Sequence, residues 1–241
     1  MASAPIFVAN WKSYLSNNSA KSWIDTYQKQ LVEMALKNNI SICPDATCLA
    51  YAVEKLSPAV RIGGQNCSAH QPGAHTGEIS AQSLKEVGAQ LCIIGHSETR
   101  KNNGDTAALI AQKALRLVEE AITPLICIGE DYQNDLLTIL PALKKTTRPI
   151  SSCFFAFEPE SAIGTNTLLP EQLLKDAMIA IESIIKATLF DTKITLFYGG
   201  SVSSTTIQSL RKISEIDGFL LGRASLDFQE LENIVICSQQ C

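Results

Sequence analysis

Short apolar runs alternate with longer helical stretches along the whole chain, and this alternation constrains the fold most strongly. The runs are bounded by turn-forming residues, as buried strands are. They cover residues 6–9, 40–43, 60–65, 91–95, 124–128, 154–157, 194–198 and 219–221. Helices are predicted between or after them at 19–37, 106–120, 135–144, 171–187 and 228–236. Strands that alternate with helices predict parallel βαβ units with right-handed crossovers.

Length and composition fit a protein with a large core. The chain has 241 residues, of which 46% are hydrophobic and 18% charged. This length suits one α/β barrel or one to two smaller domains. Since no linker, tandem repeat or low-complexity tract divides the sequence, we expect one domain over residues 1–241.

Charge and cysteine usage bear on several function classes. The net charge of −4 and the lack of a basic run argue against nucleic-acid binding. The first residues lack the basic and long apolar regions of a signal peptide, and no apolar stretch approaches the ~18 residues of a membrane span. The eight cysteines contain no CxxC pair, so we expect reduced thiols in a cytoplasmic protein.

A carboxylate follows the run at 154–157 directly. A strand-end carboxylate such as Glu158 is partly desolvated, which raises its pKa toward that of a useful general base. Pro159 stiffens the next step of the chain, and Gly164 permits conformations closed to most residues, so this segment could form a hinged lid. A structural ion pair or a solvent-facing glutamate is the alternative interpretation.

Two other strands also end in chemically useful side chains. The run at 91–95 leads into His96, and the run at 6–9 leads into Asn10, Trp11 and Lys12. Histidine can act as a neutral donor or a proton carrier near pH 7, although a lone histidine after a strand is more often structural. The three strand ends can converge only if parallel strands share one C-terminal face.

Six segments stand in one order from end to end of the chain. They are ANWK (9–12), GHSE (95–98), CIGE (127–130), FEPESAIGT (157–165), YGGSV (198–202) and DGFLLGRASL (217–226). Together they resemble the triosephosphate isomerases, although each is weak evidence alone. The resemblance implies a (β/α)8 TIM barrel whose active site lies at the C-terminal ends of the strands. It also implies interconversion of dihydroxyacetone phosphate and D-glyceraldehyde 3-phosphate in glycolysis and gluconeogenesis, without metal or cofactor.

The resemblance assigns catalytic roles residue by residue. Glu158 would move the proton between substrate carbons, a neutral His96 would polarise the carbonyl, and Lys12 would supply positive charge to the enediolate oxygens and the phosphate. Three further residues would support them. Asn10 would donate a further hydrogen bond, Glu98 would help to place the lysine, and Ser97 would lie near the base.

Phosphate binding needs oriented N–H donors more than a large cationic patch. The resemblance assigns this role to residues of the lid and of the loops after the seventh and eighth strands, where barrels often bind phosphate: Gly164, Gly200, Ser201, Gly222 and Arg223. Arg223 stands where the family usually has glycine. A left-handed conformation there would cost an arginine roughly 1 kcal/mol, and its guanidinium could bind phosphate or point to solvent.

The chain departs from the family at the lid and in one connection. Ser161 stands where the lid usually carries tryptophan and Phe157 where tyrosine is common, so we expect a different balance of open and closed lid. The connection between the fifth and sixth strands is short. Because Pro141 interrupts its helical stretch, we expect this helix to be trimmed or distorted.

A long loop at residues 65–82 follows the third strand. It resembles the family's interdigitating dimer loop, which implies a homodimer in which Thr76 lies near the partner's active site. A local Ω-loop is the alternative. His75 replaces a common aromatic residue, and Thr99 replaces an arginine that often forms an interface ion pair.

Three other functions stay open from sequence alone. An isomerase of a tetrulose phosphate would use the same residues and would be separated by kinetics with both substrates. Intact Lys12, His96 and Glu158 argue against a non-catalytic phosphosugar-binding barrel. A metal-dependent aldolase-type barrel is disfavoured because the chain has only three histidines and two of them, His70 and His75, lie in one loop.

Overall fold

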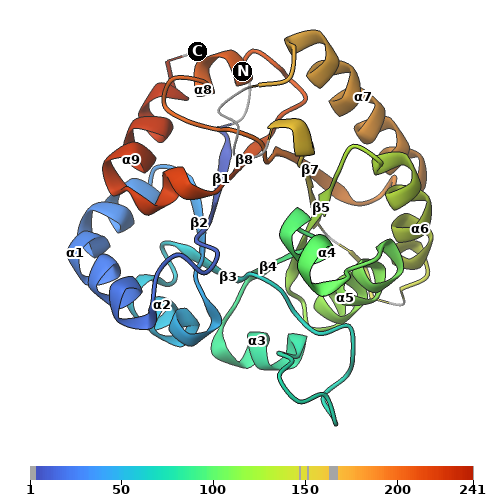
Figure 1. The fold of residues 1–241 in the computed structure, drawn as a ribbon, viewed down its shortest axis with the longest axis horizontal. Helices are drawn as coiled ribbons and strands as arrows, with labels where there is room; N and C mark the ends of the chain where they lie inside the picture. Colours follow the sequence, from blue (N-terminus) through green and yellow to red (C-terminus); the bar gives the residue numbers. More distant parts are fainter. Residues whose placement is uncertain (1–3, 147, 151, 163–167, 241) are drawn as a thin grey trace.

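The strands form a closed parallel barrel in sequence order, β1 to β8 (Figure 1). The computed structural model describes residues 4–146, 148–150, 152–162 and 168–240. The strands are β1 Ile6–Asn10, β2 Asn39–Cys43, β3 Arg61–Gly64, β4 Leu91–Ile94, β5 Thr123–Ile128, β6 Ser152–Phe157, β7 Lys193–Tyr198 and β8 Gly218–Leu221. This arrangement confirms the predicted (β/α)8 fold.

Helices surround the barrel and lie between successive strands (Figure 1). The α-helices are α1 Asn17–Ala35, α2 Leu49–Leu56, α3 Ala81–Val87, α4 Ser97–Asn103, α5 Ala107–Glu119, α6 Tyr132–Lys144, α7 Glu171–Thr188, α8 Ile207–Leu210 and α9 Phe228–Cys237. Three 3₁₀ turns in the described residues are η1 Ala46–Cys48, η2 Glu160–Ala162 and η3 Arg223–Leu226. Among the described residues, no helix is both long and apolar enough to cross a membrane.

The core has two layers because side chains of a strand point alternately to its two faces. One buried cluster fills the barrel interior: Val8, Cys43, Leu91, Ile93, Leu125, Cys127, Phe154, Ala156, Phe197 and Leu220. A larger cluster packs the outer strand faces against the helices. The barrel closes where β1 pairs with β8, with Ile6 opposite Gly218 and Ala9 opposite Leu221.

The long helices begin where short polar side chains can cap them. The Ser16 side chain accepts the N–H of Ser19 at the start of α1, and Thr106 accepts the N–H of Leu109 at the start of α5. α7 begins after Pro170, as expected from the sequence. The apolar pattern of the sequence, with Pro170 at the start of α7, located these three helices to within a few residues.

The interruption expected in the helix between β5 and β6 does not occur. α6 begins at Tyr132, earlier than expected, and runs through Pro141 to Lys144 without interruption. A proline inside a helix removes the hydrogen bond to the carbonyl four residues earlier, here that of Leu137. The Leu137 side chain is 71% exposed, so solvent can reach this turn. Buried Ile139, Leu140 and Leu143 hold both sides of the proline against the core.

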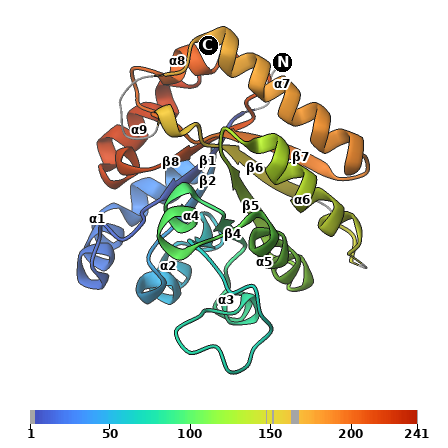
Figure 2. The ribbon, with the colours of Figure 1, turned by 45° about the vertical axis from the view of Figure 1, so that its right-hand side comes forward.

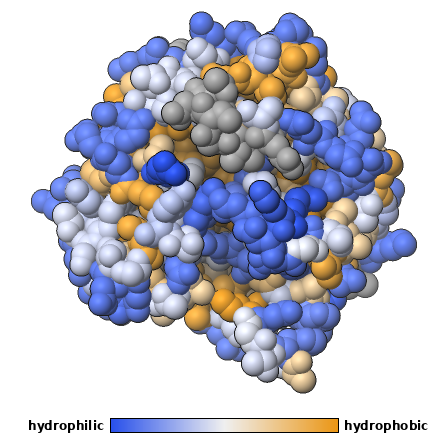
Figure 3. Space-filling model, in the orientation of Figure 1, coloured by the Kyte–Doolittle hydropathy of each residue, from blue (hydrophilic) through white to orange (hydrophobic). Residues whose placement is uncertain are grey.

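A projecting loop and a hydrophilic area mark the C-terminal face of the barrel (Figure 2 and Figure 3). The loop between β3 and α3 projects away from the barrel, and residues 71–79 are exposed (Figure 2). Hydrophilic residues gather over the middle of the face shown in Figure 3, where α4 lies in Figure 1. The strand ends that carry the predicted catalytic residues lead into loops on this face.

Candidate active site

A cavity of about 650 Å³ opens at the C-terminal ends of the strands. It brings together residues from loops that are far apart in the sequence. Its lining includes Asn10, Lys12, Tyr14, His96, Glu158, Gly199, Gly200, Ser201, Gly222 and Arg223. Eight of the residues predicted from the sequence therefore share one cavity. Glu98 and Ser97 lie behind it, and Gly164 lies outside the described residues.

Glu158 is buried at the end of β6, with only 2% of its surface exposed. Its Oε1 lies 3.3 Å from Nε2 of His96, and its Oε2 accepts the main-chain N–H of Ser97 at 3.1 Å. Burial raises the pKa of Glu158, whereas His96, the Ser97 N–H, Lys12 and the Cys127 thiol act in the opposite direction. Burial dominates, so this carboxylate is a stronger base than an ordinary glutamate.

His96 serves as the N-cap of α4. Its Nδ1 accepts the main-chain N–H of Glu98 at 3.1 Å. A neutral imidazole has one acceptor nitrogen and one N–H, so this bond places the hydrogen on Nε2. Nε2 faces Glu158 and the cavity. The side chain is thus oriented as a neutral hydrogen-bond donor toward any ligand there.

Lys12 adopts a left-handed backbone conformation, with φ of 51°. Such a conformation is unfavourable for a residue other than glycine, and neighbouring groups must hold it. The Lys12 N–H donates to Oδ1 of Asn10 at 3.1 Å, and the Lys12 carbonyl accepts from Nε2 of Gln65 at 2.6 Å. The ammonium lies 2.7 Å from Oε1 of Glu98. These contacts fix both ends of the lysine.

The loop after β7 must approach its surroundings closely. A Cβ at Gly199 would lie 2.8 Å from Cγ of Glu158, and a Cβ at Gly200 would collide with the Tyr198 hydroxyl. Both positions therefore require glycine. Burial raises the pKa of Tyr198 to about 12, so its hydroxyl keeps its proton. The next residue, Ser201, donates from Oγ to the carbonyl of Ala162 at 2.7 Å and so joins this loop to the segment after β6.

Arg223 begins η3 directly after Gly222. Among the described residues other than glycine, positive φ angles occur at Lys12 and Ala121, so the left-handed conformation considered for Arg223 does not occur. Its guanidinium carbon lies 5.6 Å from the centre of the Tyr14 ring. A side chain here is accommodated without backbone strain.

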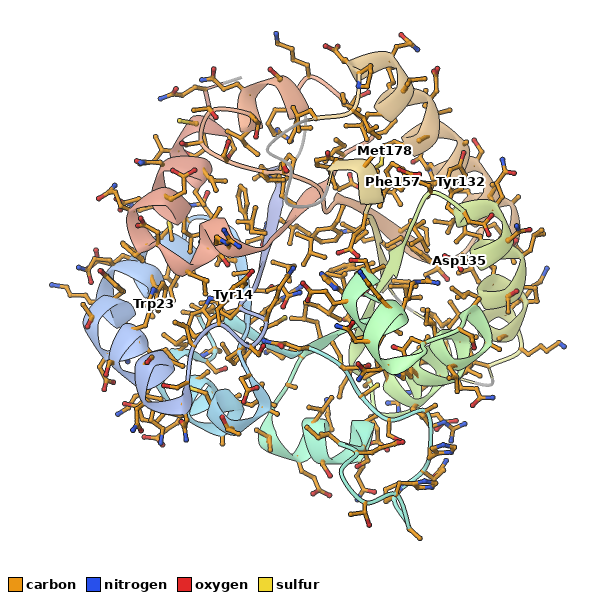
Figure 4. All side chains as sticks on the ribbon, in the orientation of Figure 1. Tyr14, Trp23, Tyr132, Asp135, Phe157 and Met178 are labelled. Atoms are coloured by element: carbon orange, nitrogen blue, oxygen red, sulfur yellow. The ribbon has the colours of Figure 1, made fainter. Side chains whose placement is uncertain are left out.

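Two contacts replace the aromatic pair that the sequence lacks at the lid. The rings of Phe157 and Tyr132 meet edge to face, with centroids 6.0 Å apart (Figure 4). Oγ of Ser161 donates to Oε1 of Glu130 at 2.9 Å. Glu130 therefore holds the beginning of this segment.

Sequence reasoning missed Gln65 and Tyr14. Gln65 also donates to the Cys43 carbonyl at 3.1 Å, so it joins the end of β2 to the lysine. Its position directly after β3 was the available signal, because polar residues at that edge tend to face the site. Tyr14 gave no such signal, since its partner Arg223 is distant in sequence.

The predicted dimer loop is exposed over residues 70–79. The rings of His70 and His75 stack at 4.0 Å, and Glu78 lies close to both, in this loop and not in the cavity. Thr76 is exposed beside them. Thr99 donates from Oγ1 to the carbonyl of His96 at 2.9 Å, so it stabilises the start of α4 within its own chain.

Comparison with known proteins agrees with this geometry. The sequence model of the family described as "Triosephosphate isomerase" matches residues 5–238. The triosephosphate isomerase of Wolbachia pipientis wMel is 36% identical over 95% of this chain and 92% of its own. That of Thermus thermophilus is 34% identical over 93% and 94%, and that of Aquifex aeolicus 33% identical over 95% and 98%. Fold, cavity and sequence relatives lead to one conclusion: the chain belongs to the triosephosphate isomerase family, and it is an isomerase.

Proposed function

We propose that Glu158 is the base that moves a proton between the two carbons of a triose phosphate, interconverting dihydroxyacetone phosphate and D-glyceraldehyde 3-phosphate. One observation carries this role. Glu158 is a buried carboxylate of raised pKa on the wall of the cavity, within 3.3 Å of a histidine nitrogen. A base of this kind is what proton abstraction next to a carbonyl requires.

The neighbouring residues supply the charge stabilisation that the reaction needs. When Glu158 takes the proton from one carbon, negative charge develops on the enediolate oxygens. His96 presents Nε2–H, and Lys12 presents its ammonium on the same cavity wall, with Asn10 as a further donor. Glu158 then returns the proton to the adjacent carbon, so the enzyme is unchanged after each turnover.

The remaining predicted residues have supporting roles in this proposal. Glu98 holds the Lys12 ammonium, and the Ser97 N–H binds the carboxylate of Glu158 between turnovers. The substrate phosphate is bound by main-chain N–H groups around the cavity: those of Gly200, Ser201, Gly222 and Arg223, with Gly164 from the lid. The glycines that the loop after β7 requires support this role, because they allow the main chain to approach a ligand.

The same proposal includes a cytoplasmic homodimer. The projecting loop 65–82 would contact the partner and bring Thr76 near its active site, which accounts for so many exposed residues in one loop. Six buried cysteines of the described chain form no disulfide, as expected for a reducing compartment: Cys43, Cys48, Cys67, Cys92, Cys127 and Cys153.

A coupled assay on purified protein tests the proposal. Turnover of dihydroxyacetone phosphate should persist with EDTA present and exceed turnover of a tetrulose phosphate. Glu158→Asp should lower kcat by about 10²-fold or more with little change in KM, because the shorter side chain moves the carboxylate by about 1 Å. Glu54→Asp, at an exposed position of α2, is the matched control. Wild-type kcat in Glu158→Asp would remove this residue from the base role.

A further inference from the structure

An arginine and a tyrosine pair at the rim of the cavity, at positions remote in sequence. Nη2 of Arg223 lies 3.4 Å from the Tyr14 hydroxyl, and the guanidinium lies over the Tyr14 ring. Tyr14 belongs to the loop between β1 and α1, and it lies between α1 and the centre of the barrel (Figure 4). Both side chains line the same cavity as Lys12 and Glu158. The pair therefore belongs to the mouth of the active site.

The arrangement of charges around the cavity leaves the Arg223 guanidinium available to bind an anion. Among the residues that the structure describes, two basic side chains line the cavity, Lys12 and Arg223. Lys12 lies 2.7 Å from Glu98, and in the proposed mechanism it also serves the enediolate oxygens. Within the described part of the chain, Arg223 forms no ion pair. A phosphate ester that enters this cavity brings up to two negative charges, and Arg223 is the cation free to meet them.

The contact with Tyr14 is weak enough to leave the Arg223 guanidinium available to a phosphate. Arg223 and Tyr14 are both exposed, and an exposed cation–π contact is weak. A guanidinium binds phosphate through two parallel, charge-assisted hydrogen bonds, which are stronger. The Tyr14 ring limits the rotamers of a long side chain that would otherwise move freely in solvent. Less conformational entropy is then lost when the phosphate binds.

We propose that the Arg223 side chain binds the substrate phosphate directly, in addition to the main-chain donors, and that Tyr14 is the positioning residue that holds the guanidinium ready beside it. The ligand class is a phosphate monoester dianion, which rests on the proposed function. The guanidinium meets the phosphate from its place beside the Tyr14 ring, so Tyr14 orients this side chain in the free and in the bound state.

The test measures phosphate affinity as well as turnover. Arg223→Met and Arg223→Gly remove the guanidinium. Arg61→Met removes the same charge from the exposed start of β3, at the opposite end of the barrel, and is the matched control. The dissociation constant of inorganic phosphate is obtained from thermal-shift titration and from competitive inhibition. We expect it to rise about three- to tenfold in both Arg223 variants, with a similar rise in KM, and to stay at the wild-type value in Arg61→Met.

Tyr14 and salt give independent readouts. Tyr14→Phe keeps the ring and should retain most of the affinity, whereas Tyr14→Ala should approach the Arg223 variants. Since exposed charges are screened by salt, KM of the wild type should rise more steeply with ionic strength than KM of Arg223→Met. Unchanged phosphate affinity in both Arg223 variants would overturn the inference. If the wild type bound phosphate through Arg223 but lacked isomerase activity, the proposed function alone would fail.

Discussion

At the scale of single residues, the site depends on a carboxylate that is buried and yet surrounded by donors. Glu158 receives the Ser97 N–H and faces Nε2 of His96, but it is almost completely removed from water. The donors keep its ionised form accessible, and burial keeps that form reactive. We expect the raised pKa of Glu158 to affect both the pH dependence of activity and the folding stability.

The raised pKa of Glu158 predicts opposite effects on activity and on stability. As pH falls, kcat/KM should decline at a pH above the ordinary glutamate value of about 4.3, because the base becomes protonated early. In the unfolded chain Glu158 ionises more readily, so the ionised residue lowers the stability of the folded state at neutral pH. That loss is relieved as pH falls through the raised pKa.

Glu158→Gln tests the stability half of this argument. The variant should lack activity but have a higher Tm than the wild type at pH 7–8, and this gain should shrink as pH falls to about 4. Thermal unfolding of both proteins across this pH range measures the difference. A Tm gain that does not vary with pH would show that the carboxylate is not strained by burial.

Lys12→Ala should nearly abolish turnover and also weaken binding of phosphate esters. In the proposed mechanism the ammonium serves the ground state through the phosphate and the transition state through the enediolate oxygens, so kcat and KM should both change. Steady-state kinetics of the variant measure both constants. Lys101→Ala, at an exposed position of α4, is the matched control. Lys113 cannot serve as a control because it forms a buried ion pair with Asp105. Normal kcat and KM in Lys12→Ala would refute the charge-stabilising role.

At the scale of elements, the segment after β6 is held at its start by polar contacts. Ser161 binds Glu130, and Ser201 binds the carbonyl of Ala162. Of these residues, Ser161 stands where the family usually has a tryptophan, and Phe157 before it stands where a tyrosine is common. We therefore expect closure of the lid to depend mainly on the phosphate of the ligand, which Gly164, Ser201 and Gly222 would bind.

The double variant Phe157→Tyr, Ser161→Trp tests this expectation about the lid. Restoring both aromatic residues should change kcat or the rate of product release more than the sum of the two single changes, because a contact between the two needs both partners. Presteady-state kinetics of the four proteins measure the coupling. If the effects of the single variants add, the two positions are uncoupled and this account of the lid is wrong.

Element boundaries were predictable where local chemistry determines them. Ser16 and Thr106 cap α1 and α5, and apolar periodicity marks the rest of these helices. α4 was not predicted because none of its seven residues is buried, so it has no apolar pattern. The gathering of Lys12, His96 and Glu158 at one cavity could be predicted, since these polar residues follow the ends of apolar runs. The contacts of Gln65 and Tyr14 could not be predicted from the sequence, because only the closed barrel brings these residues close to their partners.

At the scale of the whole molecule, the projecting loop 65–82 favours a homodimer. Thr76→Arg places a long charged side chain in the proposed interface and should shift the protein toward monomers with lower activity. Thr138→Arg, at an exposed position of α6, is the control and should leave the oligomeric state unchanged. Light scattering and activity at a series of concentrations measure the effect. A wild type that is monomeric and fully active at nanomolar concentration would contradict the dimer.

The left-handed conformation of Lys12 has a consequence for the evolution of the chain. Glycine adopts this conformation without steric strain, so folding alone does not select lysine at this position. In the proposed mechanism it is turnover that requires lysine here. A population selected in the laboratory for thermostability, with no demand for catalysis, should therefore accept Lys12→Gly readily. The proposed role of Lys12 thus predicts a stability–activity trade-off confined to one peptide unit.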